Sequence, residues 1–293
     1  MGNVHTEVLK ARGYHTAAFI AAFPLLARFG VNQGFELFDD HIETGRENRS
    51  LGFQERRAKD MTDLFLKWLQ NRPKGKFFAW VHYYAPHSSY DPPSPFKEKY
   101  FLHLYDGEIA YMDSQLGRLF EGLEKAGLDE NTLVVMVGDH GESLGKHDEE
   151  THAILIYRAT THVPLILRLP GVIPAGKAVK GVARVMDIMP TALDYMDITP
   201  PSALQSTSLR PLIHGQVDSL RLTCYTECLT PFQNFHWLPL EGVLTAKYSL
   251  IMEFYHLSKS IKCSMHTLPI SSSKNPDKRK FRPLLKTGMA GGC

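Results

Sequence analysis

The strongest constraint on the fold of this chain is a set of apolar segments in which hydrophobic and polar residues do not alternate. Three such segments are FFAWVHY (77–83), TLVVMVG (132–138) and VPLILRL (163–169). A strand with one face in water alternates apolar and polar residues, so segments without alternation are typical of strands covered on both faces. These segments therefore predict a buried sheet.

Amphipathic helices are predicted between the strands. Apolar residues recur at helical spacing from Ala58 until Pro73, and again from Ile109 to Leu123. Alternating strands and helices predict an α/β fold with a largely parallel central sheet and helices on both faces. We expect this domain to span residues 1–251. The sequence then becomes polar and basic, so residues 252–293 are expected to form a disordered tail.

The composition is that of an ordinary globular protein. Hydrophobic residues make up 43% of the chain, charged residues make up 22%, and the formal net charge is +2. This small, evenly spread charge argues against nucleic acid or a membrane surface as a partner. No apolar run reaches the length of a membrane span. The opening residues, MGNVHTEVLKARGY, show no signal-peptide pattern, so the sequence leaves the localisation unknown.

The cysteines do not indicate a cross-linked or zinc-bound protein. Cys224 and Cys228 lie in one predicted strand, where four residues span roughly 13 Å, which is too far for a disulfide. Together with Cys263 and His266 they fit no common zinc spacing. We therefore expect free or buried thiols.

The segment VVMVGDHGESLGKHDEETHA (134–153) contains three overlapping catalytic patterns. A zincin motif is excluded, because it needs two histidines one helical turn apart, whereas His147 and His152 are five positions apart. A serine-hydrolase elbow at Ser143 is disfavoured, although Ser143, Asp187 and His214 follow the chain order of such triads. An elbow directly follows its strand, and here two polar residues intervene.

Those two residues, Asp139 and His140, suit a metal site. They are the first polar residues beyond the strand predicted at 132–138. Ligands of open α/β sheets bind at the carboxyl ends of strands, and a carboxylate with a neutral imidazole suits a divalent cation. The two residues could equally cap a loop, so the pattern alone leaves both interpretations open.

Longer motifs carry a family resemblance. GDHGESLGKHDEETHAILIYRATTHVPLIL (138–167) closely resembles the metal-binding stretch of sulfatases in the alkaline phosphatase superfamily. Similar likeness extends over residues 4–251 and includes FFAWVHYYAPHSSYDPP (77–93), VMDIMPTALDYMDI (185–198) and YTECLTPFQNFHWLPLEGVLTAKYSLI (225–251). The resemblance implies the alkaline phosphatase-like fold and metal-dependent hydrolysis of a sulfate ester.

The resemblance also implies roles for individual residues. Asp139 and His140 would bind the divalent cation, for which calcium is expected first, with manganese or zinc as alternatives. His87 and His152 would be catalytic and would contact the sulfate, and His147 would be a further substrate-binding residue. Family members usually have glycine where this chain has Asp148 and Ala153.

Two residue sets are expected to be structural, the first from the family resemblance and the second from its place at the start of a predicted helix. The resemblance places the carboxylate pair Asp39 and Asp40 in a turn, away from the metal site. Asp187 resembles a helix cap more than a catalytic residue.

One family feature is missing from these 293 residues. Sulfatases carry Cys or Ser in a motif of the form Cys/Ser-x-Pro-x-Arg, whose first residue becomes the formylglycine nucleophile, and no such motif occurs here. We therefore expect a chain that is truncated at its N-terminus and inactive as written.

The expected substrate is a small sulfate ester or a sulfated carbohydrate. The alternatives are a phosphoesterase or phosphonate hydrolase of the same superfamily, or a catalytically silent member. Family members are often periplasmic, secreted or lysosomal. The sequence does not identify the particular ester, the compartment or the oligomeric state.

Overall fold

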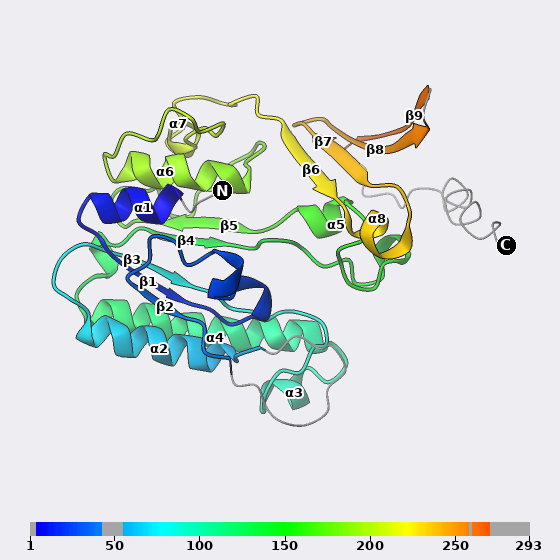
Figure 1. The fold of residues 1–293 in the computed structure, drawn as a ribbon. Helices are drawn as coiled ribbons and strands as arrows, with labels where there is room; N and C mark the ends of the chain where they lie inside the picture. Colours follow the sequence, from blue (N-terminus) through cyan, green and yellow to red (C-terminus); the bar gives the residue numbers. More distant parts are fainter. Residues whose placement is uncertain (1–3, 43–54, 258–259, 270–293) are drawn as a thin grey trace. The chain divides into compact units, whose positions relative to one another are not determined.

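The computed structural model describes residues 4–42, 55–257 and 260–269 (Figure 1). By its contacts the chain divides into two compact units, residues 1–132 and 133–293. Among the described residues, no helix combines the length and the apolarity that crossing a bilayer requires.

The first unit is built on a parallel sheet. Its strands are β1 (His15–Phe19), β2 (Leu37–Asp39) and β3 (Phe77–Val81), in the order β2-β1-β3. In the parallel register, Phe19 pairs with Asp39 on one side and with Val81 on the other. Its helices are α1 (Val4–Ala11), α2 (Ala58–Asn71), α3 (Phe96–Lys99) and α4 (Leu104–Lys125), with short 3₁₀ turns at Phe23–Leu25, Ala27–Phe29 and Asp129–Asn131.

Burial of the central strand explains why this sheet forms. Residues 17–22 of β1 and its continuation are almost completely buried. The ring of Phe19 packs edge-on against Phe65 and Trp68 of α2, with centroid distances of 6.3 and 6.1 Å. Helix α2 also contacts α4, while α1 packs against β1 and lies on the other side of the strands in Figure 1. The expected α/β class, with helices on both faces of a parallel sheet, is confirmed in this unit.

The second unit pairs its strands in antiparallel fashion. Strand β4 (Val134–Val137) pairs with β5 (Leu165–Arg168), and a second sheet has the order β6-β7-β8-β9. The strands of that second sheet are β6 (Cys224–Cys228), β7 (Leu240–Leu244), β8 (Tyr248–Leu257) and β9 (Ser260–Pro269). The helices are α5 (Arg158–Thr161), α6 (Ile188–Tyr195), α7 (Arg210–Ile213) and α8 (Thr230–Phe235), with 3₁₀ turns at Lys146–Asp148 and Val185–Asp187.

The segment expected to form a tail lies only partly in the described chain. The backbone of β8 and β9 continues the sheet as far as Pro269. Residues 270–293 lie outside the described residues.

Phe19→Ala should lower the free energy of unfolding by about 3–5 kcal/mol, because it removes a buried ring from a packed aromatic cluster. The measurement is urea unfolding followed by tryptophan fluorescence. Phe101→Ala is the control, since this ring is 69% exposed, and its effect should stay within about 0.5 kcal/mol. Equal losses in the two variants would contradict the packing described for β1.

Candidate functional site

The candidate site of the second unit lies in the loop between β4 and β5. The backbone N–H of Gly138 donates to the carbonyl of Pro164 (3.2 Å), which continues the pairing of the strands by one step. Asp139 and His140 follow at once, at the carboxyl end of β4 as the sequence predicts. The loop then folds back on itself, because the N–H of Ser143 donates to the carbonyl of Thr151 (2.7 Å).

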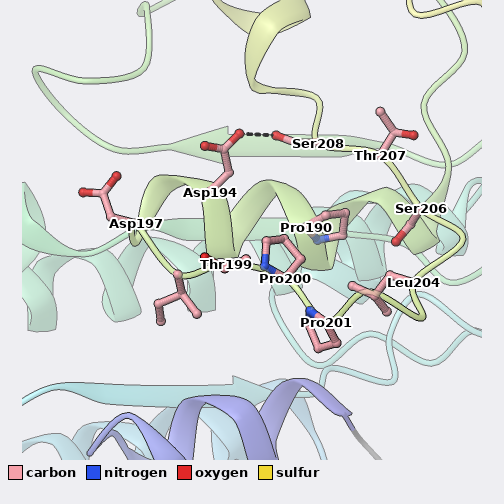
Figure 2. A pocket seen from close by; sticks show the side chains of 11 residues that line it. Pro190, Asp194, Asp197, Thr199, Pro200, Pro201, Leu204, Ser206, Thr207 and Ser208 are labelled. Atoms are coloured by element: carbon pink, nitrogen blue, oxygen red, sulfur yellow. Dashed lines mark hydrogen bonds between the residues drawn. The ribbon is translucent and has the colours of Figure 1, made fainter.

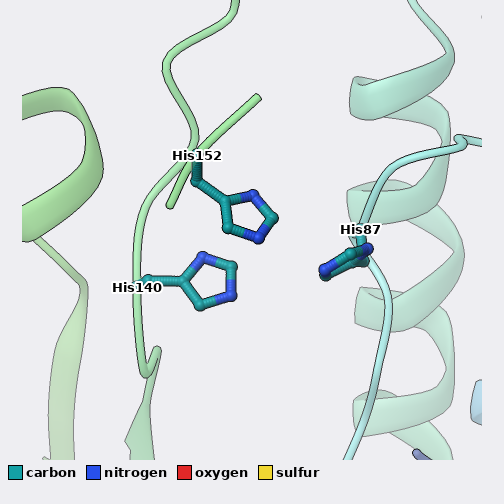
Figure 3. A group of neighbouring side chains, drawn as sticks. All are labelled: His87, His140 and His152. Carbon is teal, nitrogen blue, oxygen red and sulfur yellow. The ribbon is translucent and has the colours of Figure 1, made fainter. Parts of the chain in front are cut away.

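This folding brings His140 and His152 into contact (Figure 3). Their rings are stacked, with centroids 4.0 Å apart and planes inclined by 26°. The side chain of Asp139 is 86% exposed, and its Oδ1 accepts the backbone N–H of His140 (2.9 Å) and lies 3.8 Å from His140 Nε2. A carboxylate and two imidazoles therefore meet at the end of β4.

Hydrogen bonds at Nδ1 set the tautomers of these histidines. His140 Nδ1 lies 3.0 Å from the carbonyl oxygen of Gly141, and His152 Nδ1 lies 3.1 Å from Glu142 Oε1. A carbonyl or a carboxylate oxygen can only accept, so Nδ1 carries the proton in both rings. The lone pair of each neutral ring is then on Nε2, which is the arrangement found in metal-binding histidines.

Gly141 is required for the close approach of this loop to α5. Its N–H donates to the carbonyl of Thr160 (2.8 Å). A Cβ at position 141 would lie 2.2 Å from the carbonyl oxygen of Ala159, closer than any side chain tolerates. The close packing of this loop against α5 therefore explains why the residue after Asp139 and His140 is a glycine.

His87 lies in the first unit, in the loop that follows β3. Its ring stacks on Tyr84 at 4.3 Å, and its Nδ1 donates to the carbonyl of Ser88 (2.7 Å). The buried carboxylate of Glu108 on α4 accepts the backbone N–H groups of His87 (3.0 Å) and Asp91 (2.8 Å). Burial raises the pKa of Glu108, while these two hydrogen bonds act in the opposite direction. Glu108 thus holds the shape of the loop that carries His87.

His147 is packed against an aromatic ring. It stacks on Tyr157 with a centroid distance of 4.0 Å and an interplanar angle of 20°. Burial lowers its pKa from the ordinary value of 6.5, with Lys146 acting in the same direction and Asp148 and Glu149 opposing. His147 therefore favours the neutral form.

The disfavoured serine triad does not assemble. Ser143 is buried and its Oγ donates to the carbonyl of Lys146 (2.8 Å). Asp187 accepts hydrogen bonds from Arg184 and from the N–H of Thr207, and His214 bonds the hydroxyl of Tyr195. Asp187 is thus structural, but its carboxylate holds Arg184 and Thr207 and does not cap α6, the helix that it was expected to cap.

The other predicted structural groups also have ordinary partners. Asp39 pairs with Arg56 (2.8 Å), and Asp40 accepts the N–H of Ala27 (2.7 Å). Cys224 and Cys228, at the two ends of β6, are free thiols as expected. Figure 2 shows a pocket beside α6, whose lining includes Asp194, hydrogen-bonded to Ser208, but none of the predicted site residues.

Asp148 and Ala153, the two positions at which the family resemblance implies glycine, adopt left-handed backbone conformations. Asp148 has φ of 62° and Ala153 has φ of 80°. Glycine adopts this region without strain and aspartate tolerates it, whereas alanine pays a steric penalty. The carbonyl of Ala153 accepts a hydrogen bond from the thiol of Cys228 (3.0 Å), which helps to hold the strained residue in place.

Ala153→Gly should raise the free energy of unfolding by up to about 1 kcal/mol, because relief of the left-handed strain exceeds the added entropy of the unfolded chain. Asp148→Gly, the matched variant, should be close to neutral. Urea unfolding of both variants tests this. If Ala153→Gly loses at least as much stability as Asp148→Gly does, the backbone of residue 153 is unstrained.

Tyr157→Ala should move the pKa of His147 back towards 6.5, because the covering ring is removed. The folded pKa lies below the unfolded value, so the unfolded chain binds the proton first and stability falls as the pH drops through about 6.5. Histidine NMR titration of both proteins, native and in urea, measures these values. An identical native titration in the two proteins would mean that Tyr157 does not bury the imidazole.

Comparison with known proteins identifies the family of this chain. The family described as Sulfatase matches residues 6–198, and the family described as N-sulphoglucosamine sulphohydrolase, C-terminal, matches residues 151–266. The N-acetylglucosamine-6-O-sulfatase of Bacteroides thetaiotaomicron is 32% identical over 41% of this chain and 21% of its own length. An arylsulfatase of Clostridium perfringens is 36% identical over 40% of this chain and 25% of its own. The matches thus span about a fifth to a quarter of these relatives.

Solved structures share the fold. A protein in complex with its substrate D-glucosamine-2-N,6-O-disulfate superposes with a TM-score of 0.69 at 19% identity, covering 89% of this chain and 74% of that one. The phosphonate monoester hydrolase of Agrobacterium radiobacter gives 0.70 at 17% identity, covering 89% and 73%. The fold is thus that of the alkaline phosphatase-like enzymes, as the resemblance implies. Since the sulfatase family match covers well over half of the sequence, this chain belongs to the sulfatase family.

Proposed function

We propose that this chain supplies the cation-binding and sulfate-binding part of an enzyme that hydrolyses sulfate esters of carbohydrates. The observation that carries the proposal is the contact between His140 and His152 at the end of β4, beside Asp139. Both rings have Nδ1 held by an oxygen acceptor, so both offer Nε2.

Asp139 and His140 fit a divalent cation. Two ligand atoms of one cation, each about 2.0–2.5 Å from it, lie roughly 3–4 Å apart. Asp139 Oδ1 and His140 Nε2 are separated by 3.8 Å, within that range. When bound, such a cation stabilises negative charge on the transferred sulfuryl group. Calcium is the ion that the family resemblance implies. His140 contributes a nitrogen ligand, which also suits manganese and zinc, so these two metals are tested as well.

The remaining histidines would act on the substrate. His152 lies beside the cation ligand His140, and with a proton on Nε2 it would donate to a sulfate oxygen or to the leaving oxygen. The family motif of its loop implies the same role for His87. The hydrogen bond from His87 Nδ1 to the carbonyl of Ser88, which orients the ring, supports this role. The proposal extends to His147 as a substrate contact in the loop of His152.

The names of the relatives favour a sulfated carbohydrate. One relative is an N-acetylglucosamine-6-O-sulfatase, and one structural neighbour holds D-glucosamine-2-N,6-O-disulfate. The phosphonate hydrolase shares the fold, but the family match is to sulfatases, and we therefore prefer the sulfate ester.

The reaction needs a nucleophile that these 293 residues do not provide. No Cys/Ser-x-Pro-x-Arg motif occurs in them, and Ser143 is buried with its hydroxyl bound to a backbone carbonyl. Loss of a nucleophile that acts as a unit with its partners can cost around a millionfold in rate. We therefore propose that this chain by itself binds the cation and sulfate without turning over an ester.

Asp139→Asn should weaken binding of calcium, manganese or zinc to the 293-residue chain at least about tenfold, because it removes the only charged ligand in the proposed pair. Isothermal titration calorimetry with each metal measures this. The wild-type affinity itself should be weak, since two ligands are few for a stable site.

The control is Asp218→Asn, an exposed carboxylate outside the loop, which should leave the affinity unchanged. The same samples are assayed with 4-nitrocatechol sulfate, with and without a chelator. The cation assignment fails if Asp139→Asn binds as wild type does. Chelator-sensitive turnover by the wild-type chain would instead show that these residues contain a nucleophile.

A further inference from the structure

Glu142 is a buried acid that accepts a hydrogen bond from His152, a proposed catalytic residue. Its side chain is 4% exposed, and its Oε1 lies 3.1 Å from His152 Nδ1. A carboxylate removed from water is costly unless it is paired with a hydrogen-bond donor or a cation. The imidazole of His152 is the donor that the structure provides for it.

A second buried glutamate in the same loop shows what a purely structural role looks like. Glu149 is also buried, and its Oε1 accepts the backbone N–H groups of Ile154 (2.8 Å) and Leu155 (3.2 Å). Those bonds fix the path of the backbone and reach no functional side chain. Glu142 differs, because the group that it holds is the ring of His152.

The chemistry of imidazole gives this contact a consequence. A neutral histidine in water favours the tautomer with its proton on Nε2, whereas an acceptor at Nδ1 selects the other tautomer. The same hydrogen bond also fixes the rotation of the ring, which is stacked on His140. Nδ1 keeps its proton and donates it to Glu142, so the lone pair of the neutral ring lies on Nε2.

We propose that Glu142 is the positioning residue of His152: its buried carboxylate holds the proton of Nδ1 and the orientation of the ring, so that Nε2 faces the sulfate and donates to it when the ring carries a second proton there. The part about sulfate rests on the function proposed above. The part about the tautomer rests on the geometry alone, and the two can fail separately.

The test is long-range ¹H–¹⁵N NMR of the full chain labelled at histidine nitrogen, at about pH 8.5, well above the ordinary histidine pKa of about 6.5. His152→Asn identifies the resonances of His152. In the wild type, His152 should carry its proton on Nδ1. Glu142→Gln, which keeps the shape and loses the charge, can both donate to and accept from the ring, so the Nε2–H tautomer should rise to at least half of the population.

Glu149→Gln is the matched control, because it makes the same change at a buried glutamate of the same loop. It should leave the His152 tautomer as in the wild type. The positioning role is overturned by a wild-type His152 protonated on Nε2, a result that needs no folded variant. An equal response to Glu142→Gln and Glu149→Gln would also overturn it, since the effect would then belong to the loop in general.

Titration with inorganic sulfate separates this inference from the proposed function. This titration is run at about pH 5.5, below the ordinary histidine pKa of about 6.5, where Nε2 can carry a proton and donate to a sulfate oxygen. Sulfate should shift the Nε2 resonance of His152 in the wild type and in Glu149→Gln, with binding at least about tenfold weaker in Glu142→Gln, which lacks the carboxylate that pairs with the charged ring. Sulfate that leaves Nε2 of the wild type unshifted would refute the proposed sulfate role of His152. The tautomer measurement would still decide whether Glu142 positions the ring.

Discussion

The antiparallel pairing of β4 with β5 is the constraint on which the candidate site of the second unit depends. Val137 pairs with Leu165, and the next hydrogen bond, from Gly138 to Pro164, closes the loop of residues 138–164 at its base. Within that closed loop, the bond from Ser143 to Thr151 sets residues before 143 opposite those after 151. The contact of His140 with His152 follows from these two closures.

Much of this arrangement could be predicted from the sequence. Apolar runs located β3, β4 and β5, helical spacing located α2 and α4, and the end of the run at 132–138 located Asp139 and His140. These are local signals, since each depends on residues a few positions apart. The motif resemblance then identified the family, which physical patterns alone did not distinguish from a capped loop.

The supporting carboxylates could not be predicted in this way. Glu108 lies on a helix whose sequence reads as amphipathic, yet it is buried because the loop of His87 covers it and supplies two N–H donors. Glu142 occurs within a cluster of charged residues that a sequence reading places in solvent. Its burial and its bond to His152, ten positions away, depend on how the loop folds back. The packing of His147 on Tyr157 was missed for the same reason.

The acceptors at the three histidines differ in a way that matters for missense changes in this chain. For His87 and His140 the acceptor is a main-chain carbonyl, of Ser88 and Gly141 respectively, and a main-chain carbonyl is present whatever side chain is encoded. For His152 the acceptor is the side chain of Glu142. A single missense change at codon 142 can therefore remove the acceptor of His152, whereas a change at codon 88 retains the carbonyl that accepts from His87. Natural variants that tune this site without touching its histidines should accordingly be sought at position 142.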